Sequence, residues 1–347
     1  MAQVAAADMR DITLLKDEAG GLMMEEGIAS ITFYKGEFQP AVEALRAQFA
    51  LVVASNPWVA GRLVKGKAGT CLRHPPTPSP TDIDALFTAT AAGDEAAFKL
   101  SPFSPYIKTC TDMYASKKVI VGSGRASVGK DAPVTLLTLS ESAPGEFALI
   151  FSMSHAIADG RTYYEIMQML QPGAAVRELQ SERIPAFSES MRDMCGRKEL
   201  EWADSPGVIC MFVCGMLPCC SGPKPQCFAF ELDPERLAEA KSAAAQDGSV
   251  EYVTTNDILT SGFFSECDCR IGMMGIDCRG RVEGIGQDQA GNYVSALVLD
   301  PDTFATPAAV RKMLSSTPYK TTMRPLPGCC SAVCPCGKES SKFGVSA

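Results

Sequence analysis

The segment FALIFSMSHAIADGRTYYEIMQML, residues 147–170, constrains the fold more than any other part of the chain. Its first seven residues are mostly apolar and predict a strand. After Gly160, the apolar residues Tyr163, Ile166 and Leu170 recur at spacings of three and four, which predicts a helix that faces a core. The sequence therefore places His155 in a tight loop, residues 155–160, between a strand and a helix.

Other parts of the first half also alternate between strand and helix patterns. Residues 134–139 form a second predicted strand, and the turn Pro144-Gly145 should join it to residues 147–153 as an antiparallel hairpin. Residues 28–34 predict a strand. The helix that follows Pro40 is expected to stop at Asn56-Pro57.

The second half repeats this style. Thr254 is expected to cap a helix, with Asp257 three residues later as the partner in a capping box. A further helix is predicted at 234–246. The remaining predicted strands are 119–122, 228–232, 271–276 and 294–299.

His155 is one of only two histidines in the chain. An unperturbed imidazole has a pKa of about 6.5, which suits removal of a proton from an alcohol, amine or thiol. Asp159 would either orient the ring or pair with an arginine and hold the loop, and Gly160 would let the chain turn without a Cβ clash. The structural alternative is a buried histidine bonded to a loop aspartate. The other histidine, His74, lies in a proline-rich stretch and is expected at the surface.

Composition excludes several classes of protein. The 347 residues carry 32 basic and 40 acidic side chains, a net charge of −8, which argues against a nucleic-acid partner. No apolar run reaches the roughly 18 residues of a membrane span. The N-terminal segment lacks the cationic start of a signal peptide. We therefore expect a cytoplasmic globular protein.

The cysteines predict no metal site. Their number, fifteen, is odd, and thiols stay reduced in the cytosol. Zinc sites usually need two cysteine pairs separated by a longer loop, and no matching second pair is obvious. The two clusters weighed are Cys329, Cys330, Cys334 and Cys336 near the C-terminus, and Cys267, Cys269 and Cys278 before them.

His155-Ala156-Ile157-Ala158-Asp159-Gly160 resembles the HxxxDG signature of the CoA-dependent acyltransferase superfamily. That group includes chloramphenicol acetyltransferase, plant BAHD-type and alcohol acyltransferases, and peptide-synthetase condensation domains. Residues 54–64, 254–264 and 276–294 are similar to further segments of these enzymes. The likeness covers most of the chain in order, and the histidine motif is its specific part.

The resemblance implies an α/β fold (an α+β sandwich) made of two chloramphenicol-acetyltransferase-like lobes, with the histidine facing a tunnel between them. We expect a first lobe at 1–175, a crossover linker at 176–225 and a second lobe at 226–347. The D-F-G-W-type loop of the plant enzymes has no counterpart here. The second lobe is therefore expected to be truncated or divergent.

The resemblance also implies roles for individual residues. His155 would deprotonate a small-molecule alcohol or amine for direct attack on acyl-CoA, the co-substrate. Asp159 would be structural and paired with Arg279, or in second place with Arg281, although both arginines are equally compatible with a solvated loop. Asn292 would support the active-site loop.

Two further sets of residues concern the thioester and CoA. Candidate donors to the oxyanion are Ser152, Ser154 and the Gly160 N–H, and the sequence does not decide whether the face shared by the two serines meets the substrate. The phosphates of CoA need a local basic patch, and one fourteen-residue segment without acidic side chains offers it, unless it is simply a solvated helix face. Its basic residues are Arg311, Lys312, Lys320 and Arg324.

Two alternatives to an acyl-CoA enzyme stay open. One is a condensation-type catalyst fed by carrier-bound thioesters. The other is a catalytically degenerate member that binds a hydrophobic ligand or a partner. The apolar stretch 207–217 is compatible with an acyl-pocket wall, a peripheral membrane contact or a buried core segment.

Overall fold

The computed structural model describes residues 9–91, 119–203, 205–206, 208–209, 232–246, 248–316, 318–320 and 343–346. The chain forms two compact units. The first comprises Met1–Pro185 and Ile285–Tyr293, and the second comprises Ala186–Gly284 and Val294–Ala347.

The boundary after Pro185 falls inside the predicted linker at 176–225, which stays a prediction. The buried side chain of Asn56 donates to the Arg177 carbonyl oxygen at 3.0 Å and accepts from the Leu179 N–H at 2.9 Å. Gln180 then forms a β-bridge with Gln289. These contacts hold the start of the predicted linker in the first unit and bring 285–293 back to it.

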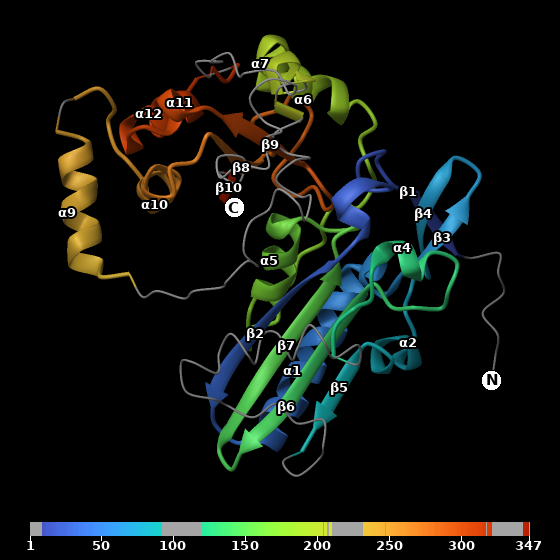
Figure 1. Cartoon of the computed structure of the whole chain (residues 1–347). Helices are drawn as coiled ribbons and strands as arrows, with labels where there is room; N and C mark the ends of the chain where they lie inside the picture. The colour runs from blue at the N-terminus through green and yellow to red at the C-terminus, as the bar shows by residue number, and fades with distance from the viewer. Residues whose placement is uncertain are drawn as a thin grey trace, which may run out of the picture. The chain divides into compact units, whose positions relative to one another are not determined.

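The main sheet of the first unit has four strands in the order β2-β7-β6-β5 (Figure 1). Their bounds are Gly27–Lys35 for β2, Glu146–Ser154 for β7, Thr135–Ala143 for β6 and Phe87–Thr90 for β5. β2 and β6 both run antiparallel to β7, while β5 runs parallel to β6. The predicted strand at 28–34 and the predicted hairpin are confirmed.

Two helices cover one face of this sheet. They are α1 (Phe38–Ser55) and α5 (Gly160–Met169), which share a core with Phe151 and Met153 of β7. α1 ends at Ser55 with Asn56 as its C-cap, before Pro57, as predicted, and it begins at Phe38, two residues before Pro40. Pro57–Ala60 then forms a 3₁₀ helix, like Gly21–Met24 earlier in the chain.

The opposite face of the sheet carries a smaller cluster that includes Ile31, Ile150 and the residues Val119 and Ile120. The strand predicted at 119–122 is wrong, because this segment is a turn and bend that packs its apolar side chains on the sheet without pairing. The short helix α4 (Gly124–Ser127) follows this segment.

A second sheet of the first unit has the order β1-β4-β3, all antiparallel. The bounds are Arg10–Thr13, Gly69–His74 and Arg62–Gly66 in that order. His74 ends β4 with 5% of its surface exposed, so the expected surface position is wrong. The helix α2 (Pro80–Asp84) interrupts the proline-rich stretch that follows it.

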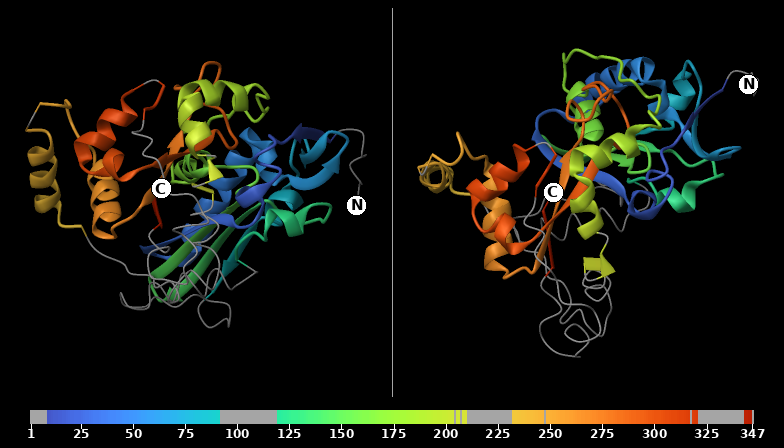
Figure 2. Two further views of the ribbon diagram at one scale, coloured as in Figure 1. Left: turned by 45° about the horizontal axis from the view of Figure 1, so that its top comes forward. Right: turned by 90° about the horizontal axis from the view of Figure 1, so that it is seen from above.

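The second unit contains the three-stranded sheet β10-β8-β9. β8 (Ile271–Asp277) pairs antiparallel with β9 (Val294–Leu299) and parallel with β10 (Phe343–Ser346). Its helices are α6 (Phe187–Cys195), α7 (Arg197–Ala203), α9 (Pro234–Ala244), α10 (Thr255–Glu266), α11 (Pro301–Phe304) and α12 (Pro307–Leu314). α10, α11 and α12 contact one another and form the orange and red helical group in Figure 2.

The predicted strands at 271–276 and 294–299 and the predicted helix at 234–246 are confirmed in the second unit. The capping box is also confirmed: Thr254 and Asp257 exchange both hydrogen bonds at the start of α10. Most of the predicted strand at 228–232 and most of the apolar stretch 207–217 lie outside the described residues.

No helix in the described part of the chain is long and apolar enough to cross a bilayer. Among the same residues, no three His, Cys, Asp or Glu side chains are placed to hold a metal ion. Burial raises the pKa of Cys269 to about 11 and that of Cys278 to about 12, so both thiols are neutral. The C-terminal cysteine cluster, Cys329 to Cys336, lies outside the described residues.

Candidate active site

His155 follows the last residue of β7 and opens the loop to α5. Its ring is partly exposed, whereas the next three residues, Ala156 to Ala158, are fully buried. Nδ1 lies 3.1 Å from the carbonyl oxygen of Ala158. A carbonyl can only accept, so Nδ1 carries the proton and Nε2 keeps its lone pair. The loop therefore holds the imidazole in the tautomer that a general base needs.

Asp159 is the N-cap of α5 and is 1% exposed. Its Oδ1 accepts from the Thr162 N–H at 2.8 Å, and its Oδ2 accepts from the Tyr293 N–H at 3.0 Å. The carboxylate thus starts the helix and binds the segment 285–293 to the histidine loop. This geometry favours the loop-holding role for Asp159 over orientation of the ring, because Nδ1 already donates to Ala158.

We predict that Asp159→Asn lowers stability and activity together. The asparagine offers one oxygen where two N–H groups now find acceptors, and a buried unsatisfied group costs about 1–3 kcal/mol. Urea unfolding should be measured side by side with the rate of CoA release, the activity that the HxxxDG resemblance implies. Asp82→Asn, in the part-buried capping box of α2, is a matched control that should leave the rate unchanged. An unaltered rate in Asp159→Asn would contradict the assignment.

Gly291 and Asn292, in the segment 285–293, also contact the histidine loop and the first turn of α5. The Gly291 carbonyl oxygen accepts from the Asp159 N–H at 3.3 Å and from the Thr162 hydroxyl at 3.1 Å. The Asn292 side-chain amide donates to the His155 carbonyl oxygen at 2.7 Å. Asn292 therefore contacts the residue that it was expected to support, and its effect on catalysis stays a prediction.

Arg183 and Glu18 form a buried ion pair that contacts these residues and that the sequence did not indicate. Arg183 Nε donates to both oxygens of Glu18, at 2.8 and 3.0 Å, and the two side chains are 3% and 0% exposed. Glu18 also accepts from the Asn292 N–H at 2.8 Å. Arg183 donates in addition to the carbonyl oxygens of Ala290 and Ile157, both at 3.0 Å. The pair thus joins the N-terminal segment, the 285–293 segment and the histidine loop.

α5 is fastened to the sheet by one tyrosine of its buried face. The Tyr163 hydroxyl donates to the Phe151 carbonyl oxygen at 2.8 Å and lies 2.6 Å from the Ser30 hydroxyl. Its ring packs on that of Phe151 with the centroids 5.0 Å apart. The histidine loop is therefore held at both of its ends.

The remaining residues of the loop region have different surroundings. A Cβ at Gly160 would meet no atom of the described residues within 4 Å, so the expected clash is wrong, and this position stays open beside His155. The Ser152 hydroxyl accepts from the Val121 N–H at 3.1 Å. The Ser154 hydroxyl is buried and has no hydrogen-bond partner among the described residues. Whether either serine donates to an oxyanion stays a prediction.

Both arginines predicted to pair with Asp159 belong to the second unit. Arg279 is 3% exposed and donates through Nη1 to Asp277 at 2.8 Å. Arg281 donates through Nη1 to the Tyr319 hydroxyl at 2.8 Å. The pairing of Asp159 with either arginine stays a prediction.

In the predicted basic patch, Arg311 already has a structural partner. Its guanidinium donates to Asp257 at 2.6 and 2.8 Å and to the Thr254 hydroxyl at 2.9 Å. It also lies over the Tyr252 ring, 5.0 Å from the centroid. Arg311 therefore ties α12 to the capping box of α10, which limits what it can offer a phosphate.

The other basic residues of the patch are less constrained. Lys312 and Lys320 are exposed, and Arg324 lies outside the described residues. Lys312 borders a hollow of about 310 Å³ that is also lined by Arg311, Glu251 and two serines of the α12 end. The contribution of this patch to CoA binding stays a prediction.

Neither a family model nor a curated protein matches this chain. Solved structures do. TRI101 of F. sporotrichioides complexed with coenzyme A and T-2 has a TM-score of 0.55 and 17% identity, over 88% of this chain and 74% of that chain. TRI101 of F. graminearum complexed with ethyl coenzyme A has a TM-score of 0.53 and 14% identity, with coverages of 88% and 75%.

A third similar structure is the first condensation domain of the calcium-dependent antibiotic synthetase in complex with a substrate analogue, with a TM-score of 0.56 and 16% identity, over 88% of this chain and 75% of that chain. The predicted fold is confirmed. The chain has the mixed α/β fold of the TRI101 structures and of this condensation domain. At such identities the likeness concerns the fold and leaves the reaction to the residues of the site.

Proposed function

We propose that this protein transfers an acyl group from acyl-CoA to the hydroxyl or amine of a small molecule, with His155 as the general base. The observation that carries the proposal is the hydrogen bond from Nδ1 to the Ala158 carbonyl, which leaves Nε2 as the proton acceptor. The shared fold supports it, because similar structures contain coenzyme A.

The reaction needs no acyl-enzyme. Nε2 takes the proton of the acceptor as the acceptor oxygen or nitrogen attacks the thioester carbon. The tetrahedral oxyanion then collapses, the carbon–sulfur bond breaks, and the CoA thiolate takes the proton back from the imidazolium. A hydroxyl or N–H close to the thioester must stabilise the oxyanion, and we assign this to Ser154 or the Gly160 N–H. Among the described residues, no atom lies within 4 Å of the place that a Cβ at Gly160 would take, and we propose that a substrate occupies this space next to the base.

His155→Ala is expected to abolish this chemistry without unfolding the protein. General-base catalysis is typically worth about 10²- to 10⁴-fold in rate, and a partly exposed side chain contributes little to the core. The assay is release of the CoA thiol from acetyl-, hexanoyl- and palmitoyl-CoA with a panel of alcohols and amines. His74→Ala, which removes the only other histidine, should keep the activity. If His155→Ala releases CoA as fast as the wild type, His155 is not the base.

A condensation-type reaction is the second candidate, because a condensation domain has the same fold. It would use the same base with a thioester carried on a protein-bound pantetheine. Acyl groups presented on a carrier protein and on free CoA separate the two candidates. Turnover with the carrier alone would favour condensation. A protein that is inactive with both donors would be the degenerate, ligand-binding member.

A further inference from the structure

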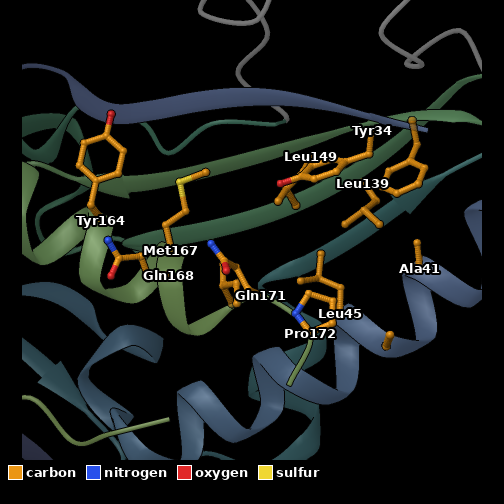
Figure 3. Close-up of a pocket in the computed structure, with 13 residues that line it drawn as sticks. Tyr34, Ala41, Leu45, Leu139, Leu149, Tyr164, Met167, Gln168, Gln171 and Pro172 are labelled. Atoms are coloured by element: carbon orange, nitrogen blue, oxygen red, sulfur yellow. The ribbon is translucent and has the colours of Figure 1, made fainter. Parts of the chain in front are cut away.

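An apolar cavity of about 590 Å³ lies in the first unit, between the sheet and the two helices that cover it (Figure 3). Its walls come from β2, β6, β7, α1, the part of α5 from Tyr164 onwards, and residues 170–172 that follow α5. Tyr164 is the lining residue nearest in sequence to the histidine loop, about 6 Å along the α5 axis from Gly160, and no residue of the loop 155–160 lines the cavity. The cavity is therefore separate from His155.

The cavity exists because α1 presents small side chains where larger ones would fill the space. Ala41 and Ala44 line it, whereas Val42, Phe49 and Val52 on the same helix are buried in the core. On the sheet side, the rings of Tyr34 and Phe147 stack with their centroids 5.6 Å apart at an interplanar angle of 19°. This flat aromatic wall borders the space that the two alanines leave open.

The chemistry of the walls selects for a neutral molecule. None of the thirteen lining residues carries a charge, in a chain of which 21% is charged. The polar groups are two side-chain amides, Gln168 and Gln171, and two phenols. In Figure 3 both glutamines lie on the α5 side, and the aliphatic side chains of Leu45 and Leu139 lie on the other. A cavity of this volume, apolar with a few polar groups on one side, has the features of a small-molecule site.

We propose that this cavity binds a neutral, largely apolar small molecule that contains a ring and hydrogen-bonding groups at one end. The ring would pack on the Tyr34–Phe147 wall, and the polar end would face Gln168 and Gln171. Such a ligand would contact the end of α5, the helix whose first turn holds the histidine loop. This site goes beyond the proposed acyl transfer and does not depend on it.

The test uses N-phenyl-1-naphthylamine, a neutral aromatic probe whose fluorescence rises in apolar surroundings. The probe itself is excited, so that an introduced tryptophan does not contribute to the signal. Ala44→Trp puts an indole into the cavity from an exposed helical position, so it should fold normally and weaken probe binding by about tenfold or more. Ala47→Trp is the matched control. It makes the same change at an exposed position of the same helix that does not line the cavity, and it should bind the probe like the wild type.

Two further variants make the result specific. Gln168→Glu adds a carboxylate to the cavity wall and should lower the affinity for the neutral probe. The His155→Ala variant should bind the probe with unchanged affinity. Loss of acyl transfer with retained probe binding would thus separate the two proposals. Equal affinities of Ala44→Trp and Ala47→Trp would overturn the site. Probe affinity that falls as the protein concentration rises would also overturn it, because a second copy of the chain would then occupy the cavity.

Discussion

Arg183→Met is expected to lower the free energy of unfolding by about 3–5 kcal/mol, the usual cost of removing one partner from a buried ion pair. The Glu18 carboxylate is fully buried and would lose its cation. The carbonyl oxygens of Ala290 and Ile157 would lose their donor at the same time. Because Ile157 lies within the histidine loop, the activity should fall as well. Urea denaturation measures the first effect and CoA release the second.

Glu18→Gln and the double variant distinguish the ion pair from simple loss of packing. Glu18→Gln leaves the Arg183 cation buried and should cost a similar amount. The double variant should cost clearly less than the sum of the two, because neither charge is then stranded. Arg125→Met removes the exposed ion pair with Glu25, whose side chains are 62% and 50% exposed, and should change stability by less than about 1 kcal/mol. Additive effects at Glu18 and Arg183 would mean that the two charges stabilise the fold independently.

Local patterns in the sequence were sufficient for much of the fold. The hairpin, the capping box at Thr254 and the end of α1 before Pro57 each depend on residues a few positions apart. The position of His155 at the end of a strand was predictable for the same reason. Each of these features arises from backbone geometry and from caps that neighbouring side chains provide.

The support of the histidine loop was not predictable in this way. Glu18 and Arg183 are 165 positions apart, and neither lies in a motif. A buried charge is indistinguishable from a solvated one in sequence, because its partner is decided by the tertiary fold. The Gly-Asn pair at 291–292 was noticed only through a resemblance. Its contact with His155 depends on the return of 285–293 to the first unit.

Two wrong predictions have a common physical origin. Residues 119–122 have strand composition but pack as a turn, since apolar side chains can cover a sheet face without joining the ladder. His74 was expected at the surface because prolines follow it. Instead β4 carries it into the unit, and desolvation by burial lowers the pKa of its imidazole. In both cases tertiary packing decided what local composition left open.

Gly291→Ala adds a single methyl group, and we expect it to lower stability and activity more than any other glycine-to-alanine change near His155. Its φ of +129° is a conformation that side chains other than glycine rarely adopt. An added Cβ would lie 2.8 Å from Cζ of Arg183, whose guanidinium is held by Glu18 and by carbonyl oxygens on several sides. Backbone strain of about 1–3 kcal/mol would therefore combine with partial loss of the ion pair, for a total of about 3 kcal/mol or more.

The control for this variant separates strain from collision. Gly145→Ala lies in the turn between β6 and β7 with a φ of +77°, and its Cβ would meet no atom of the described residues within 4 Å. It should cost only the strain of a left-handed residue, about 1–2 kcal/mol, and leave CoA release intact. Gly291→Ala should unfold at a lower urea concentration and also lose activity, because the Gly291 carbonyl oxygen holds Asp159 and Thr162. Equal midpoints for the two variants would mean that Arg183 can move aside, and that the ion pair does not fix the histidine loop rigidly.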